Sequence, residues 1–190
     1  DFRILQLLSG AVRKMSEGEL LQIEKARSLN LDESVYFEII RNKTASLLAS
    51  ACAAGAFSSS GDEQLSEKLG RFGEAVGIAF QIKDDLFDYG NEQTGKPSGN
   101  DLKEKKLTLP LIYTLNTVDR PLRRELIYII KNQNRNPEKI KYVLGRVVEA
   151  GGIRYATEKM NRYRDDALAI LYEFDDSEVR KGLEELVRFT

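Results

Sequence analysis

The segment FQIKDDLFD, residues 80–88, places three carboxylates in an apolar run, with a glutamine one helical turn before them. Residues three and four positions apart are neighbours on the surface of an α-helix. The glutamine and the acids are therefore expected to form one polar patch, made of Gln81, Asp84, Asp85 and Asp88. Three acids at this spacing repel one another unless a cation lies between them, and Mg²⁺ accepts carboxylate oxygens as ligands. The segment thus predicts a helix with a magnesium site whose ligands are Asp84, Asp85 and Asp88.

The flanking residues bear on two interpretations of this pattern. A DDxxD pattern alone is most simply a solvated acidic face. Here most of the surrounding helix surface is apolar, through Ile78, Ala79, Phe80, Ile82, Leu86 and Phe87. That surface favours the wall of a cavity over open solvent.

Four further motifs flank the acidic segment. Upstream lie MSEGE at 15–19 with Gln22, and RNKTA at 41–45; downstream lie GKPSGNDL at 95–102 and KKLTLP at 105–110. In order and spacing these motifs resemble those of the trans-isoprenyl (polyprenyl) diphosphate synthases: MSxGExxQ, KTA, FQxxDDxxD, GKxxGxDL and KxTLP. The resemblance covers residues 1 to about 115, and the chain most resembles a long-chain, octaprenyl-type synthase.

This resemblance implies an all-α fold, a helical bundle of the class I isoprenoid synthase type. It also implies a prenyltransferase that condenses isopentenyl diphosphate with an allylic diphosphate by Mg²⁺-assisted ionisation, giving a polyprenyl diphosphate. In that scheme Mg²⁺ and lysines stabilise the departing diphosphate, and the double bond of isopentenyl diphosphate attacks the allylic cation. A proton is then lost to the released diphosphate. A homodimer is implied as well, paired through the helices that carry MSxGExxQ and KTA.

Residue roles are carried by the same resemblance. Lys43 with Thr44 matches the pair that contacts the allylic diphosphate. The resemblance implies diphosphate binding by Lys43, Thr44, Gln81, Lys96 and Lys106, and catalytic roles for Asp84, Asp85 and Lys43. Lys105 stands where many members of the family have glycine, which changes the local charge.

Only one of the family's two aspartate-rich motifs occurs in the chain. We therefore expect residues 1–190 to be the C-terminal part of a single isoprenoid synthase domain that lacks its N-terminal helices. Such a piece is expected to be inactive by itself, because it supplies only part of the metal cluster and lacks the contacts to isopentenyl diphosphate. The residues that set product length in this family lie near the first motif, so the sequence does not indicate product length.

Composition narrows the chemistry further. The chain has a net charge of −1, with no basic excess that would indicate nucleic acid. It has no histidine, which excludes Ser–His and Cys–His nucleophiles and histidine-ligated zinc. Cys52 is the only cysteine, so no intramolecular disulfide can form. No signal peptide is seen, and no apolar run reaches the roughly 18 residues of a membrane span, so we expect a cytoplasmic protein.

Helical periodicity is widespread and no segment alternates with period two, so no strand is expected. The predicted helices are 2–15, 17–29, 32–56, 62–90, 108–117, 120–132, 137–150, 152–174 and 176–188. Turn residues predict a bend at 57–61, and a polar segment predicts a loop at 90–106.

Small residues predict close helix packing in two places. Gly70, Gly73 and Gly77 repeat on the helix that carries the acids, which predicts contact with another helix. Small side chains also dominate from Ala45 to Ala56. Two interpretations of that stripe stay open: tight helix packing, or room for a bulky apolar substrate beside Lys43. They are compatible, because one face of the helix could serve packing and another the substrate.

Other functions are weighed against the synthase. A catalytically silent subunit that stabilises a complete synthase usually has a degraded acidic motif, whereas this motif is intact. A helical interaction protein would require the DDxxD to be a surface coincidence among five ordered motifs. A terpene cyclase shares the class I fold but usually carries an asparagine/serine-type second motif.

Overall fold

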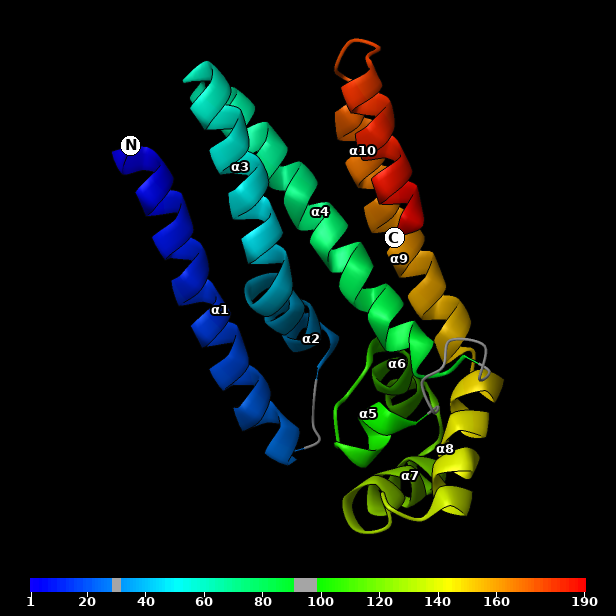
Figure 1. The fold of residues 1–190 in the computed structure, drawn as a ribbon. Coiled ribbons are helices and arrows are strands. Elements are labelled where there is room, and N and C mark those ends of the chain that lie inside the picture. Colours follow the sequence, from blue (N-terminus) through cyan, green and yellow to red (C-terminus); the bar gives the residue numbers. More distant parts are fainter. Residues whose placement is uncertain (29–31, 91–98) are drawn as a thin grey trace. The chain divides into compact units, whose positions relative to one another are not determined.

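The computed structural model describes residues 1–28, 32–90 and 99–190, which are mostly helical (Figure 1). In chain order the elements are α1 (Phe2–Ser28), α2 (Glu33–Ile40), the π-helical turn η1 (Arg41–Ala45), α3 (Ser46–Ser60), α4 (Glu63–Phe87), α5 (Asn100–Lys103), α6 (Leu109–Thr117), α7 (Arg120–Asn132), α8 (Pro137–Glu149), α9 (Gly152–Leu171) and α10 (Glu178–Phe189). No strand occurs within these described ranges, so the predicted all-α fold class is confirmed.

Several predicted boundaries are wrong. α4 ends at Phe87 and α9 at Leu171, three residues before the predicted ends at 90 and 174. The predicted break inside MSEGE does not occur: α1 runs on through Ser16, whose hydroxyl donates to the Val12 carbonyl at 3.1 Å. The turn predicted at 57–61 is helical up to Ser60. Only Gly61, with φ +68°, takes the left-handed conformation that ends α3.

A π-helical turn divides the helix predicted for 32–56. In η1 the N–H of Ser46 bonds to the carbonyl of Arg41, five residues earlier. Such turns inside α-helices are frequent at functional sites. This one contains Lys43, and the hydrophobic periodicity of the sequence did not reveal it.

The described chain divides into two compact units. Unit 1 holds residues 1–22, 37–81 and 159–190, and unit 2 holds residues 23–36 and 82–158. The core of unit 1 forms where α3, α4, α9 and α10 meet. Its buried members are Phe72, Ala75, Val76, Ala167, Leu168, Leu171 and Val187, with Leu48, Cys52, Leu69, Ile170 and Leu183 packed against them.

α4 packs closely against α3 and the preceding η1 because it presents glycines to them. A Cβ on Gly73 would stand 2.5 Å from the carbonyl oxygen of Leu48, and one on Gly77 would stand 2.6 Å from the Cα of Ala45. A Cβ on Gly70 would make ordinary contact with α3 at 3.5 Å. The predicted contact of the three glycines with another helix is confirmed, and the small side chains of α3 serve tight packing on this face.

Unit 2 is built on α6, α7 and α8, which pack against one another. Each begins with a proline in its first turn, Pro110, Pro121 and Pro137, where a helix has no use for the missing N–H. Asp119 and Asn136 cap α7 and α8 by accepting backbone N–H groups of the first turn. Of these signals Pro110 marks where α6 starts, and the start of α6 forms part of the site described below.

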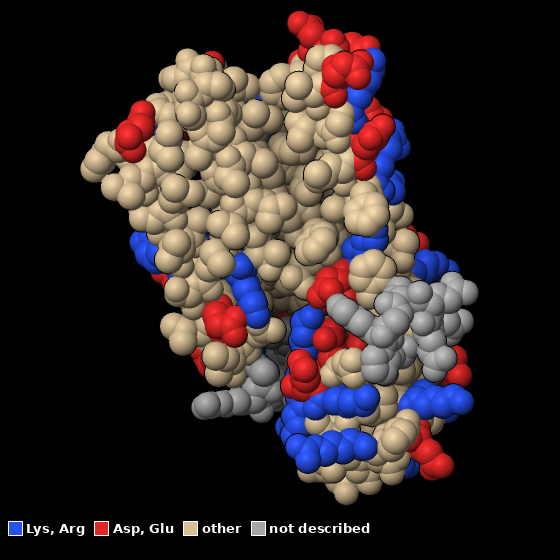
Figure 2. All heavy atoms as spheres, in the orientation of Figure 1, with Lys and Arg blue, Asp and Glu red and all other residues tan. Residues whose placement is uncertain are grey.

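α1 carries an exposed apolar stripe on unit 1, made of Phe2, Leu5, Leu8, Val12 and Leu20. Figure 2 shows few Lys, Arg, Asp or Glu side chains on the face formed by α1, α3 and α4 in this view. None of the helices in the described ranges is long and apolar enough to cross a bilayer. Exposed apolar surface of this kind favours association with other protein surface.

Candidate functional site

Asp85, near the end of α4 in unit 2, is fully buried among hydrogen-bond donors. The hydroxyl of Tyr36 donates to its Oδ2 at 2.8 Å, and the backbone N–H of Leu109 donates to the same oxygen at 3.2 Å. The Nζ of Lys106 lies 3.2 Å from Oδ1. Leu109 is the first residue of α6, so Asp85 accepts one of the N–H groups that a helix leaves without an internal partner at its start.

Burial and charge act in opposite directions on Asp85 and Lys106. Burial raises the pKa of Asp85 above its usual 3.8, while its donors lower it. Burial lowers the pKa of Lys106, but Asp85 and Asp101 outweigh burial and raise that pKa above its usual 10.5. Lys106 therefore stays a cation at neutral pH.

Lys106 lies among three carboxylates of unit 2. Its Nζ is 3.2 Å from Asp85, 3.3 Å from Asp101 and 3.9 Å from Asp84. The side chain of Asp84 is 43% exposed, whereas that of Asp101 is 20% exposed and that of Asp85 is not exposed. Asp84 is therefore the carboxylate of this group that an ion arriving from solvent can reach most easily.

The carboxylate of Asp88 accepts hydrogen bonds from backbone N–H groups at the start of α5. It accepts the N–H of Asn100 at 2.8 Å and that of Asp101 at 3.3 Å. Burial, and then the charge of Asp101, raise the pKa of Asp88. In the part of the chain that the structure describes, no three acidic, cysteine or histidine side chains are arranged to hold a metal ion. The three predicted ligands thus have different partners here, and Asp84 is more open than the buried Asp85.

A left-handed residue turns the chain into Lys106. Lys105 has φ +59°, a conformation that glycine adopts at lower cost than any residue with a Cβ. The N–H of Lys105 bonds to the carbonyl of Leu102 and that of Lys106 to the carbonyl of Asp101, the Schellman pattern that ends a helix. The loop predicted at 90–106 therefore contains a capped helix, α5. The turn therefore has a backbone conformation that would suit glycine better than lysine at position 105.

In unit 1 the predicted Lys43 and Thr44 are joined to two other motifs. Lys43 Nζ donates to Gln22 Oε1 at 2.7 Å and lies 2.7 Å from a carboxylate oxygen of Glu19. The Thr44 hydroxyl donates to Gln81 Oε1 at 3.0 Å. The structure thus brings MSEGE and Gln22 to the lysine of the KT pair, and the glutamine of FQ to its threonine.

Four residues of these clusters were not among the predicted site residues. Glu19, Gln22 and Asp101 lie within motifs that the sequence shows, so the motifs were the signal for them. Tyr36 has no such signal, because a single tyrosine in an apolar helix is most simply a core residue. Lys96, the remaining predicted diphosphate ligand, lies outside the described residues.

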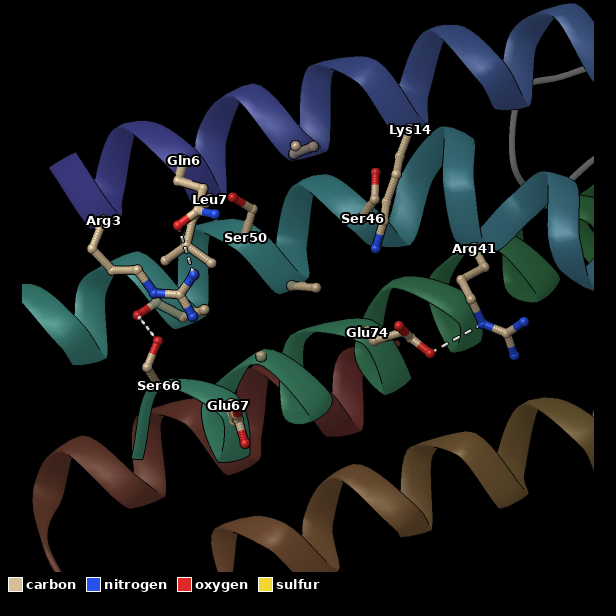
Figure 3. A pocket seen from close by; sticks show the side chains of 15 residues that line it. Arg3, Gln6, Leu7, Lys14, Arg41, Ser46, Ser50, Ser66, Glu67 and Glu74 are labelled. Carbon is tan, nitrogen blue, oxygen red and sulfur yellow. Dashed lines mark hydrogen bonds and ion pairs between the residues drawn. The ribbon is translucent and has the colours of Figure 1, made fainter. Parts of the chain in front are cut away.

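A cavity of about 280 Å³ lies in unit 1 between α1, α3 and α4 (Figure 3). Small side chains of α3 form one wall, namely Ser46, Ala49, Ser50 and Ala53. Figure 3 shows Arg41 paired with Glu74, which also line the cavity, and the Arg41 Nε to Glu74 Oε1 distance is 3.1 Å. Lys43 is not part of this lining, so room for a substrate beside Lys43 stays a prediction.

Comparison with known sequences gives one family. The chain matches the family model described as Polyprenyl synthetase over residues 1–147. It is 30% identical to the octaprenyl diphosphate synthase of Escherichia coli over 185 residues. The matched part is 96% of this chain and 57% of that protein. The chain spans about half the length of the curated relatives it matches.

Solved structures give the same fold. A decaprenyl diphosphate synthase from Rhodobacter capsulatus matches with a TM-score of 0.92 and 30% identity, over 100% of this chain and 59% of that one. A polyprenyl synthase from Caulobacter crescentus, complexed with calcium and isoprenyl diphosphate, matches with a TM-score of 0.90 and 35% identity, over 100% of this chain and 58% of that one. The predicted helical bundle of the isoprenoid synthase type is confirmed.

Proposed function

Because the chain belongs to the polyprenyl synthetase family, we propose that the whole protein is a prenyltransferase. It condenses isopentenyl diphosphate with an allylic diphosphate, with Mg²⁺ assisting ionisation, and gives a polyprenyl diphosphate. One observation carries the proposal: the carboxylate of Asp84, which is partly exposed to solvent, stands 3.9 Å from the ammonium of Lys106. The charges of Asp85 and Asp101 raise the pKa of Lys106 and so keep it a cation. A magnesium diphosphate needs such a carboxylate and such a cation side by side.

The residues that would hold the metal are those of the acidic motif. We assign Asp84, Asp85 and Asp88 to it, with Asp84 reached before the buried Asp85 because its side chain is 43% exposed. When bound, Mg²⁺ would neutralise the negative charge that develops on the departing diphosphate. The complex of the Caulobacter crescentus relative with calcium and isoprenyl diphosphate supports a divalent ion and a diphosphate in this family.

The lysines have the complementary role. In our proposal Lys43, Thr44, Gln81 and Lys106, together with Lys96, bind diphosphate oxygens. Charge-assisted hydrogen bonds from the ammonium groups strengthen as negative charge moves onto the leaving group, so they stabilise the transition state more than the substrate. A proton would leave to the released diphosphate, which agrees with a chain that has no histidine to accept it.

We also propose a homodimer. The exposed apolar stripe of α1 supports it, because such surface is costly to leave in water. Sedimentation should give a dimer at protein concentrations on the order of tens of micromolar, within the usual affinity range. A monomer under those conditions would contradict the proposal.

Cytoplasmic location stays a prediction.

The activity is tested with the whole protein, Mg²⁺, labelled isopentenyl diphosphate and an allylic diphosphate. Chain elongation is expected, and Asp84→Ala should lower turnover about a hundredfold or more. Asp165→Ala is the matched control, since it removes an exposed aspartate that pairs with its neighbour Arg164, and it should leave turnover unchanged. Unchanged turnover in Asp84→Ala at saturating Mg²⁺ would overturn the assignment. A protein that makes no product but raises the activity of a second synthase would indicate the silent subunit instead.

A further inference from the structure

The phenol of Tyr36 is buried against the carboxylate of Asp85. Tyr36 is 3% exposed, and its hydroxyl meets Asp85 Oδ2 at 2.8 Å. The N–H of Leu109 meets the same oxygen, so two donors from distant parts of the chain fix Oδ2. The other oxygen, Oδ1, is left facing the Lys106 ammonium at 3.2 Å.

We propose that Tyr36 is a positioning residue for Lys106 and acts through Asp85. The phenol sets the rotation of the carboxylate, and the carboxylate sets where the ammonium stands beside Asp84. The inference rests on the proposed function in one respect, that Lys106 binds diphosphate. Asp85 then serves the diphosphate through Lys106 and not only as part of a metal-binding motif.

Loss of the hydroxyl has a definite expected effect. Oδ2 would keep only the N–H of Leu109, so the carboxylate could turn and offer both oxygens to Lys106. The ammonium would be drawn toward the buried acid and away from Asp84, where solvent and an anionic ligand reach it. Hydrogen bonds to charged groups are among the stronger ones in proteins, so pyrophosphate binding should weaken about tenfold.

The test compares two tyrosine variants of the full chain. Tyr36→Phe removes the hydroxyl and keeps the ring, so core packing is retained. Tyr155→Phe is the matched control, because the Tyr155 hydroxyl also donates to a carboxylate in unit 2, that of Glu33, at 2.6 and 2.8 Å. Both variants therefore lose one phenol-to-carboxylate bond, and only one of these bonds involves Asp85.

Two readouts separate positioning from stability. The first is the side-chain ammonium signal of Lys106 in ¹⁵N-lysine-labelled protein, identified by its loss in Lys106→Arg. The second is calorimetric affinity for inorganic pyrophosphate with Mg²⁺. Tyr36→Phe should shift the ammonium signal and weaken pyrophosphate binding about tenfold. Asp85→Asn should move the same signal further, while Tyr155→Phe should leave both readouts as in the wild type.

The outcomes are distinguishable. An ammonium signal that is identical in wild type and Tyr36→Phe would overturn the inference, as would equal shifts in Tyr36→Phe and Tyr155→Phe. A wild-type chain that does not bind pyrophosphate would count against the proposed function. In that case the ammonium signal still decides whether Tyr36 positions Lys106.

Discussion

Gly18 of α1 lies directly against the backbone of Lys43: a Cβ at Gly18 would stand 2.7 Å from the Lys43 amide nitrogen. This close approach brings α1 near enough for Gln22 and Glu19 to reach the Lys43 ammonium. The glycine of MSEGE and the lysine of the KT pair are thus two sides of one contact in unit 1.

Replacement of Gly18 by alanine should therefore disturb this contact. The new Cβ meets backbone, which cannot move aside cheaply, so we expect a loss of about 2 kcal/mol in the free energy of unfolding. Gly10→Ala on the same helix is the control, since a Cβ there meets nothing within 4 Å. Gly10→Ala should increase the free energy of unfolding by at most about 1 kcal/mol, because alanine has a higher helix propensity than glycine. Urea denaturation measures both, and equal stabilities of the two variants would contradict the contact.

Glycine at position 105 should stabilise the chain. Lys105 occupies the left-handed region at φ +59°, which costs a residue with a Cβ about 1 kcal/mol. Lys105→Gly should raise the free energy of unfolding by about that amount. The gain is reduced by the loss of the exposed hydrogen bond from the Lys105 Nζ to the Lys131 carbonyl. Lys103→Gly inside α5 is the control and should lower stability by about 1 kcal/mol. A destabilised Lys105→Gly variant in thermal denaturation would mean that the turn is not strained.

The neighbouring aspartates 84 and 85 should differ in their importance for stability. Asp85→Ala leaves a buried hydroxyl, a helix N–H and an ammonium without their shared acceptor, and should cost about 3 kcal/mol. Asp84→Ala removes a half-exposed carboxylate and should change stability by about 0.5 kcal/mol or less. Chemical denaturation of both variants checks this contrast. Similar losses would show that the burial of Asp85 is not what holds this region together.

The single cysteine allows a test of burial in unit 1. Burial raises the pKa of the Cys52 thiol above its usual 9.0. The thiolate is the reactive form, so iodoacetamide should react more slowly with the folded chain than with the chain in denaturant at the same mildly alkaline pH. Equal rates would indicate an exposed thiol.

The same shift predicts a pH dependence of stability. The folded thiol keeps its proton to a higher pH than the unfolded one. As pH rises through 9.0 the unfolded state releases its proton first, so the free energy of unfolding should fall. Cys52→Ala should remove that part of the fall. An unchanged slope in the alkaline range would contradict the raised pKa.

The helices were largely predictable because their signals are local. Apolar periodicity, prolines in first turns and capping residues lie within a few positions of the structure that they determine, as at Pro110, Asp119 and Asn136. One error occurred where a contact from elsewhere in the chain lies at the predicted break. α1 continues through Gly18, which packs on Lys43, although the local pattern favoured a break.

The sequence by itself determined that three aspartates share one helix and that lysines follow them at fixed spacing. It could not determine which aspartate is buried, because consecutive residues on a helix differ by about 100° in direction and either could face the core. That choice was made by the tertiary structure. Tyr36 and the first N–H of α6 approach one side of α4, so Asp85 is enclosed there while Asp84 stays in contact with solvent.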